Sequence, residues 1–278
     1  MVSRPLGTIV DLANRLWPPA LAEEWDNPGL ALGSLDAEIS RILLAVDVTP
    51  SVLEEARASE CQLILTHHPS LFRQAGTLRQ DSWPGGLLSR AAEERIALFS
   101  AHTNADAAED GVNDALALAL GLSQTHPLHP VKPQDRTGIG RRGILSRPAP
   151  LVQVAHDLAR ALPGTAAGIL VQGCPDRPIR SVTLCSGSGA DFLSDPAVRL
   201  SDLYVTSDLK HHEALDVRSA GELGLRAPAL ICVSHWAGES LWLTRAAAAI
   251  SRETGIECIL SAQRTDPWDF RVGDGDGE

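Results

Sequence analysis

Positive charge is scarce in this chain. Lysine occurs only at Lys132 and Lys210, and 24 Lys and Arg residues stand against 35 Asp and Glu residues, a formal net charge of -11. Nucleic acids and anionic membranes are bound by clustered basic side chains that neutralise phosphates. The charge balance therefore argues against DNA, RNA or an anionic membrane as a general partner.

The sequence shows neither a disulfide framework nor a membrane segment. The five cysteines are odd in number, far apart and without a C-x-x-C pair, and three lie within apolar runs, which is typical of reduced core thiols. Asp11 and Arg15 interrupt the N-terminal apolar pattern, so it lacks the apolar core of a signal peptide. No later stretch is long enough to span a bilayer. We expect a cytoplasmic globular protein.

Six short apolar runs each end in a polar cluster. They are RILLAVDVTP (41–50), CQLILTHHP (61–69), RIALFSAHTNAD (95–106), SVTLCSGSGAD (181–191), DLYVTSDLKHH (202–212) and PALICVSHWAGE (228–239). Helices are expected at SVLEEARA after Thr49 and Pro50, at GVNDALALALG up to Gly121, and at LVQVAHDLARAL. Strands that alternate with helices predict an α/β fold with parallel or mixed sheets, where ligands collect at the carboxyl ends of strands.

The segment HPLHPVKPQDRTGIGRR (126–142) has no clear periodicity and contains three prolines, so we expect it to connect two lobes. It includes a G-x-G-x-x-G from Gly138 to Gly143. This is a weak match, because a dinucleotide fingerprint must follow a strand and open a helix. We expect a first lobe at residues 1–130, a second lobe at residues 131–278, and a frayed C-terminal tail from about residue 271.

Histidines gather where three of the runs end. His67 and His68, the H-T-N-x-D segment from residue 102, and the H-W-A-G-E segment from residue 235 supply imidazole nitrogens and carboxylate oxygens. These donors suit Zn, Fe, Mn or Ni rather than Mg or Ca alone. Adjacent strand residues point to opposite faces, so His67 and His68 can reach two ions only if the chain bends near Pro69. The alternative is that these are hydrogen-bonded polar residues lining a domain interface.

Two further segments have simpler interpretations. The loop SGSGAD (186–191) could cradle an anion with its backbone N–H groups, but a tight turn that needs positive φ is the favoured interpretation. EEWDNPG (23–29) contains Trp25 and Asp26 before a Pro-Gly turn. We interpret it as a structural turn that orders the rim of the site.

Seven segments, in order, resemble the signature segments of one family. They are EEWDNPGL (23–30), THHPSLF (66–72), AHTNADAAEDGVNDALALALGL (101–122), GIGRRG (138–143), SGSGADFL (186–193), SDLKHHEALD (207–216) and SHWAGE (234–239). The family is that of the GTP cyclohydrolase 1 type 2 homologues, also called NGG-interacting-factor-3-like proteins. The resemblance implies two related α/β lobes with mixed sheets around a central dinuclear metal site, commonly assembled as a ring-shaped homohexamer. Longer members carry an inserted domain, for which this chain is too short.

The resemblance also implies which residues bind two divalent ions. His67 and His68 would bind different ions, with Asp106 as the carboxylate of the first lobe; His235 and Glu239 would complete the pair from the second lobe, Glu239 as the bridge. Several other residues would line or orient the site: His102, Asn104, Lys210, His211 and His212. Of these, His102 and His212 are candidates for proton transfer. The chain departs from the family pattern at Ser207, Trp236 and Gly238, without losing a metal ligand.

Two classes of function follow. A pair of metal ions activates water for attack, which supports a metal-dependent hydrolase acting on a nucleotide, a phosphorylated compound or a related small molecule. The family name suggests hydrolytic ring opening of GTP with release of formate, and a phosphoesterase would fit the same site. The alternative is a non-enzymatic protein that stores, delivers or inserts metal, or a ring-shaped interaction scaffold.

Overall fold

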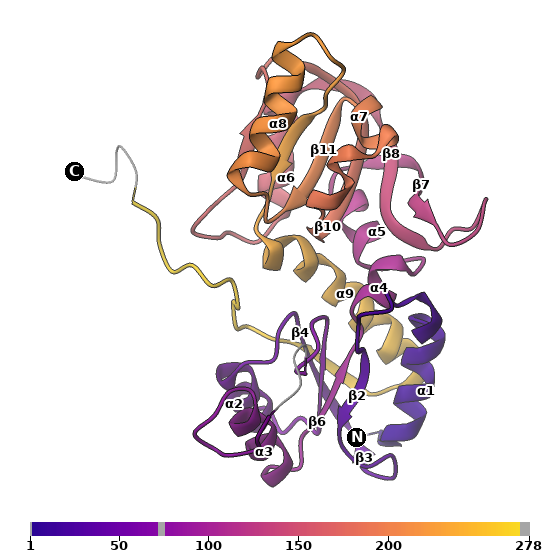
Figure 1. The fold of residues 1–278 in the computed structure, drawn as a ribbon. Helices are drawn as coiled ribbons and strands as arrows, with labels where there is room; N and C mark the ends of the chain where they lie inside the picture. Colours follow the sequence, from indigo (N-terminus) through magenta and orange to yellow (C-terminus); the bar gives the residue numbers. More distant parts are fainter. Residues whose placement is uncertain (1, 72–75, 273–278) are drawn as a thin grey trace. The chain divides into compact units, whose positions relative to one another are not determined.

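A computed structural model describes residues 2–71 and 76–272. The chain divides into two compact units, each an α/β unit with a mixed sheet (Figure 1). Unit 1 comprises Met1–Gly111 and Trp242–Thr265, and unit 2 comprises Val112–Leu241 and Asp266–Glu278. The chain therefore leaves unit 1 after Gly111 and returns to it inside helix α9 (His235–Thr254).

Unit 1 is built on a five-stranded sheet of order β13-β4-β5-β6-β2. The first four strands are parallel, and β2 is antiparallel to β6. The strands are β2 (Gly29–Leu32), β4 (Arg41–Ala45), β5 (Leu63–Thr66), β6 (Ala97–Ser100) and β13 (Glu257–Leu260); β1 (Arg4–Pro5) pairs separately with β3 (Glu38–Ile39). The helices are α1 (Leu6–Leu16), the 3-10 helix η1 (Pro19–Leu21), α2 (Pro50–Ala58), α3 (Gly85–Glu93), α4 (Thr103–Ala107) and the later part of α9.

The central strands of unit 1 are apolar along almost their whole length. β4, β5 and β6 are buried at nearly every residue, which is the pattern of parallel strands covered on both faces. Helices α2 and α3 lie side by side (Figure 1). Leu53 of α2 and Leu88 of α3 pack in one cluster with Leu43 and Ile64 of the sheet, so the two helices share one of its faces. Since β4, β5 and β6 run in parallel, the residues that follow them collect at the same edge of the sheet.

Unit 2 contains a six-stranded sheet of order β7-β8-β10-β11-β12-β9. β10, β11 and β12 are parallel, and the other pairs are antiparallel. The strands are β7 (Leu122–Pro130), β8 (Gly138–Pro150), β9 (Leu170–Gln172), β10 (Pro178–Ser188), β11 (Leu203–Ser207) and β12 (Ala229–Cys232). The helices are α5 (Val112–Ala119), α6 (Leu151–Ala161), the 3-10 helix η2 (Ala190–Ser194), α7 (Pro196–Leu200), α8 (His211–Glu222) and the first part of α9.

Helices cover both faces of the unit 2 sheet. Leu184 and Val205 face α5 and α6 in one apolar cluster. The residues next to them in sequence, Cys185 and Tyr204, belong to a second cluster with α7 and α8. This alternation is the period of two that strands impose.

The sequence predictions of elements are largely confirmed. All six apolar runs contain strands, namely β4, β5, β6, β10, β11 and β12, and the three predicted helices are α2, α5 and α6. The hydroxyl of Thr49 accepts a hydrogen bond from the N–H of Val52, 3.3 Å away, and caps α2 as expected. Within the described ranges, no helix combines the length and the apolar character needed to cross a membrane.

The prediction of a connection at residues 126–142 was wrong. These residues lie largely in β7 and β8, two long antiparallel strands. Pro127 and Pro130 are tolerated because β7 is the edge strand of its sheet, where one row of N–H groups needs no neighbour, and Pro133 lies in the turn before β8. The G-x-G-x-x-G lies within β8 and opens no helix, so it is no dinucleotide fingerprint. The lobe boundary expected at residue 130 falls in the β7–β8 turn, inside unit 2.

The C-terminal tail was expected to fray from about residue 271. Arg271 and Val272 are exposed and belong to no helix or strand. The rest of the expected tail, residues 273–278, lies outside the described residues.

Candidate metal centre

Three histidines of unit 1 form a compact group at the carboxyl edge of its sheet. Their ring centroids are 4.9 Å apart for His67 and His68, 5.2 Å for His67 and His102, and 5.4 Å for His68 and His102. One ring nitrogen from each lies within 4.8 Å of the other two. His67 and His102 are buried and His68 is partly buried. Three neutral nitrogen donors at this spacing are suited to a transition metal.

The chain bends where β5 ends, which was the condition for His67 and His68 both to reach metal ions. The N–H groups of His67 and His68 still donate to the carbonyls of Ala45 and Val46, at 3.2 and 2.9 Å. The hydroxyl of Thr66, however, donates to the carbonyl of His68 at 2.7 Å and closes a local turn. This turn places both rings on the same side, which a regular strand would not do.

Each ring in this group has its Nδ1 atom next to an oxygen that can only accept a hydrogen bond. Nδ1 of His67 lies 2.9 Å from the carbonyl oxygen of Ala101, and Nδ1 of His68 lies 2.7 Å from Oδ1 of Asp47. Nδ1 of His102 lies 2.8 Å from Oδ1 of Asp26. With Nδ1–H as donor, the lone pair of a neutral ring lies on Nε2, which is the arrangement of metal-binding histidines.

Asp26 links the EEWDNPG segment to this group. Its second carboxylate oxygen accepts hydrogen bonds from the N–H of Thr103 at 3.0 Å and from the Thr103 hydroxyl. Burial alone would raise the pKa of Asp26, but the hydrogen bonds from His102 and Thr103 outweigh it and lower the pKa to about 2. The turn therefore fixes the ring of His102, consistent with the expected role in ordering the rim of the site.

Two other residues of the H-T-N-x-D segment have different roles. Asp106 is on α4, with Oδ1 3.9 Å from Nε2 of His67, so a carboxylate lies close to this ring. Asn104 accepts a hydrogen bond from the N–H of His102 at 2.8 Å and donates one to the carbonyl of Trp17 at 2.7 Å. Asn104 therefore orients the backbone of the site.

In unit 2, His235 and Glu239 lie one turn apart at the start of α9. Nε2 of His235 lies 2.8 Å from Oε1 of Glu239, and Nδ1 lies 2.6 Å from Oδ2 of Asp208. Burial alone would lower the pKa of His235, but the Glu239 and Asp208 carboxylates outweigh it and raise the pKa to about 11. A site that holds a proton this strongly between two carboxylates has the charge to hold a divalent cation instead.

The loop SGSGAD packs against this pair. At Gly187 φ is 73°, and a Cβ atom there would lie 2.7 Å from Oε1 of Glu239 and 3.3 Å from Nε2 of His235. The N–H of Ser186 donates to Oδ1 of Asn113 at 2.8 Å, and the N–H of Gly189 donates to the hydroxyl of Thr206 at 2.9 Å. These N–H groups are used inside the protein, which favours the tight turn over the anion cradle. The glycine leaves space around the donor atoms of the pair.

The basic residues of the D-L-K-H-H segment lie on an exposed surface. Lys210 precedes α8, and its N–H donates to Oε2 of Glu213 at 2.7 Å. His211 and His212 begin α8, are exposed, and contact each other with ring centroids 5.1 Å apart. Their expected place along the rim of the site stays a prediction, as does proton transfer by His102 and His212.

Three carboxylates that orient the histidines were not predicted as such. Asp47 accepts from His68 and also from the hydroxyl of Thr265, while Asp26 and Asp208 accept from His102 and His235. Asp208 has a φ of 54°, a left-handed conformation that Asp tolerates better than most residues. The sequence did contain a signal for them. Asp47 follows an apolar run, and Asp26 and Asp208 lie in the segments EEWDNPGL and SDLKHHEALD.

The structure is that of an α/β protein with histidine and carboxylate groups that could hold a metal ion. Residues 5–267 match the family described as Duf34/NIF3 (NGG1p interacting factor 3). A Streptomyces coelicolor protein named GTP cyclohydrolase 1 type 2 homolog is 36% identical over 274 residues, which cover 96% of this chain and 94% of that protein. NIF3-like protein 1 of Drosophila melanogaster is 30% identical over 264 residues, which cover 94% and 87%. The chain belongs to the Duf34/NIF3 family.

A solved structure has the same fold. A Bacillus cereus protein related to NIF3 matches with a TM-score of 0.84 at 23% identity, covering 98% of this chain and 100% of that chain. A Mycobacterium leprae relative, 28% identical, aligns over 384 residues, more than the 278 of this chain. That relative therefore contains sequence with no counterpart here.

Proposed function

We propose that this protein is a metal-dependent hydrolase that binds two divalent ions through His67, His68, Asp106, His235 and Glu239. The observation that carries the proposal is the common orientation of the rings. His67, His68 and His235 each have Nδ1 next to a carbonyl or carboxylate oxygen. Nε2 of each ring is then the atom that would bind a metal ion. An oxygen that accepts a hydrogen bond from the other ring nitrogen strengthens metal binding by a histidine.

The number of donors supports binding by both groups together. His235 and Glu239 supply two donors, fewer than the three or four protein ligands that zinc sites of enzymes use. His67 and His68 of unit 1 supply nitrogen donors and Asp106 adds a carboxylate. Glu239 would be the ligand shared by both ions, because its carboxylate would offset the repulsion between two dications.

Hydrolysis is the reaction that suits this set. Two bound divalent ions would polarise a substrate oxygen and lower the pKa of a bound water. His102, oriented by Asp26 and next to the rings of His67 and His68, would carry a proton to or from the reacting group. The substrate class is a nucleotide or a related small molecule, in line with the name of the bacterial relatives, GTP cyclohydrolase 1 type 2 homolog.

The test begins with elemental analysis of protein purified without added metal, with about two ions expected per chain. The same sample is then screened against nucleotides and phosphoesters, and hydrolysis is expected that a chelator abolishes and added metal restores. Stoichiometric metal without turnover of any compound would favour metal storage or delivery instead. Protein that neither retains nor takes up metal would contradict the proposal as a whole.

A further inference from the structure

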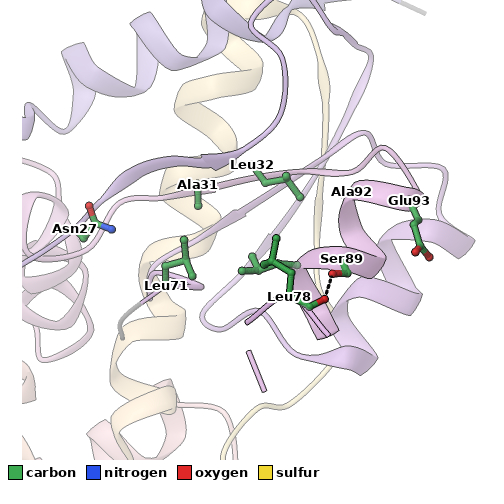
Figure 2. A pocket seen from close by; sticks show the side chains of 9 residues that line it. Asn27, Ala31, Leu32, Leu71, Leu78, Ser89, Ala92 and Glu93 are labelled. Carbon is green, nitrogen blue, oxygen red and sulfur yellow. Dashed lines mark hydrogen bonds between the residues drawn. The ribbon is translucent and has the colours of Figure 1, made fainter. Parts of the chain in front are cut away.

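Unit 1 contains a pocket that none of the metal-binding residues lines. Its volume is about 720 Å³, within the range of pockets that bind small molecules. The walls are mostly apolar, with Leu32 of β2, Leu71 and Leu78 (Figure 2). Leu88 of α3 also lines the pocket. Leu78 remains 63% exposed. A flat apolar ligand in this pocket would cover the exposed surface of Leu78. It would gain roughly 25 cal/mol of binding free energy for each Å² of apolar surface removed from water.

Three described polar residues line the pocket: Asn27, Ser89 and Glu93, and the Ser89 hydroxyl donates to the carbonyl of Leu78. In Figure 2, Asn27 is at one end, Glu93 is at the other, and Leu71 and Leu78 lie between them. Glu93 is the one ionisable residue among the described residues that line the pocket, and its Oε1 accepts a hydrogen bond from Nε2 of Gln80 at 2.7 Å. A carboxylate here attracts a cation or an N–H donor and repels an anionic group.

Asn27, at the other end of the pocket, is linked to His102 through Asp26. Asn27 follows Asp26, and its N–H donates to Oδ1 of Asp26 at 2.7 Å, the same atom that faces Nδ1 of His102. Trp25, on the other side of Asp26, is 64% exposed and contacts the ring of His102 with a centroid distance of 5.8 Å. Three consecutive residues thus connect the pocket, the orienting carboxylate and an exposed aromatic surface beside the metal-binding group.

We infer that this pocket binds the planar ring system of the substrate, and that this ring system is neutral or cationic rather than anionic. The inference rests on the proposed function and narrows its substrate class. Glu93 recognises an N–H or amino group at the far edge of the ring. Asn27 contacts the edge nearer His102, and the reactive part of the substrate extends past Trp25 toward the histidines. Phosphate groups, where present, lie outside the pocket.

Three naphthalene probes of equal size test the ligand class in the full chain after treatment with a chelator. They are 2-naphthylmethylamine (cation), 2-naphthalenemethanol (neutral) and 2-naphthoate (anion), each titrated by ligand-observed NMR. The amine and the alcohol are expected to bind, with the amine at least about threefold tighter than the carboxylate, because one partly exposed charge contributes up to about 1 kcal/mol. Glu93→Gln is expected to remove this preference. Equal binding of all three probes to the parent would overturn the inference.

A second pair of variants locates the binding. Ala92→Trp adds bulk at an exposed alanine of α3 that lines the pocket, and is expected to weaken the amine at least tenfold. Ala58→Trp makes the same change at an exposed alanine of α2 that is not among the lining residues, and is expected to leave binding unchanged. Equal probe affinity in the two variants would overturn the inference. The metal content of both variants is measured as well, because it tests the proposed function independently of the pocket. Probe binding by a chain that never takes up metal would sink only the proposed function, and metal uptake without probe binding would sink only the pocket.

Discussion

The ring of His235 lies between two carboxylates, with Nε2 2.8 Å from Oε1 of Glu239 and Nδ1 2.6 Å from Oδ2 of Asp208. In metal-free protein this ring carries a proton over a wide pH range, because the two carboxylates raise its pKa from 6.5 to about 11. Metal and proton therefore compete for the same nitrogen, and uptake of metal near neutral pH is expected to release a proton at this site.

The raised pKa of His235 also predicts how the stability of the metal-free protein depends on pH. The stabilisation from the protonated ring is complete below pH 6.5 and is lost progressively as pH rises toward 11. The advantage of the parent over His235→Gln should therefore shrink between these values. Chemical denaturation of both chains, treated with chelator, measures this difference at each pH. A difference that grows with pH would contradict the assignment of the proton.

Glu239→Gln keeps the shape of the side chain and removes its charge. If the carboxylate bridges two ions, both lose a ligand, and bound metal should fall from about two ions per chain toward one or none. His67→Gln should empty mainly one position, since a histidine serves one ion. Elemental analysis and circular dichroism on the two variants and the parent make the comparison. Two tightly held ions in folded Glu239→Gln protein would show that Glu239 is no bridge.

Gly187→Ala places a methyl group 2.7 Å from Oε1 of Glu239 at a position with a φ of 73°. The carboxylate must move, so metal affinity is expected to fall at least about tenfold, in addition to a loss of about 1–2 kcal/mol of stability from the backbone conformation. Gly224→Ala is the matched control, because its φ is 76° and no atom lies within 4 Å of the new methyl group. The control should lose stability but keep its metal affinity, as measured by denaturation and metal titration.

Asp26→Asn removes the carboxylate that orients His102. Metal-dependent activity is expected to fall by roughly 10 to 100-fold, the usual effect of losing such an orienting partner. Because the pKa of Asp26 is lowered to about 2, its contribution to stability is present above pH 3.8 and lost as pH falls through about 2. The stability gap between variant and parent should close over that interval. Asp11→Asn, an exposed change on α1 of the same unit, should show no such gap.

The homohexamer implied by the resemblance is tested by light scattering at micromolar concentration. Several large apolar side chains are exposed in the single chain, among them Leu170, Leu223 and Phe270. A closed assembly would cover part of such surface. A mass near six times 29.6 kDa is expected, and a monomer would contradict the hexamer.

The parts of the fold that the sequence revealed are those with strong local signals. β4, β5 and β6 are short, apolar and bounded by polar residues, and Thr49 with Pro50 marks the start of α2. The adjacent histidines also implied a bend at the end of β5, which the Thr66 hydroxyl provides. These features depend on residues a few positions apart, so a single sequence was enough to predict them.

The features that escaped prediction depend on distant pairs or on position in the sheet. Asp26 and His102 are 76 residues apart, and no local pattern indicates that one orients the other. β7 contains prolines because it is an edge strand, a property that only the assembled sheet defines. The same holds for β13, which pairs with β4 although some 200 residues separate them in sequence.

Because β13 forms one edge of the unit 1 sheet beside β4, the order of folding cannot follow the order of synthesis. During synthesis, strands β2, β4, β5 and β6 of that sheet emerge early, but β13 is complete only after residue 260. Most of unit 2, from Val112 to Leu241, is by then already available as one continuous segment. Unit 2 can therefore be complete before unit 1. Until β13 is synthesised, the sheet that holds the histidines of unit 1 has an unpaired edge at β4, which the nascent chain must keep from pairing with another strand.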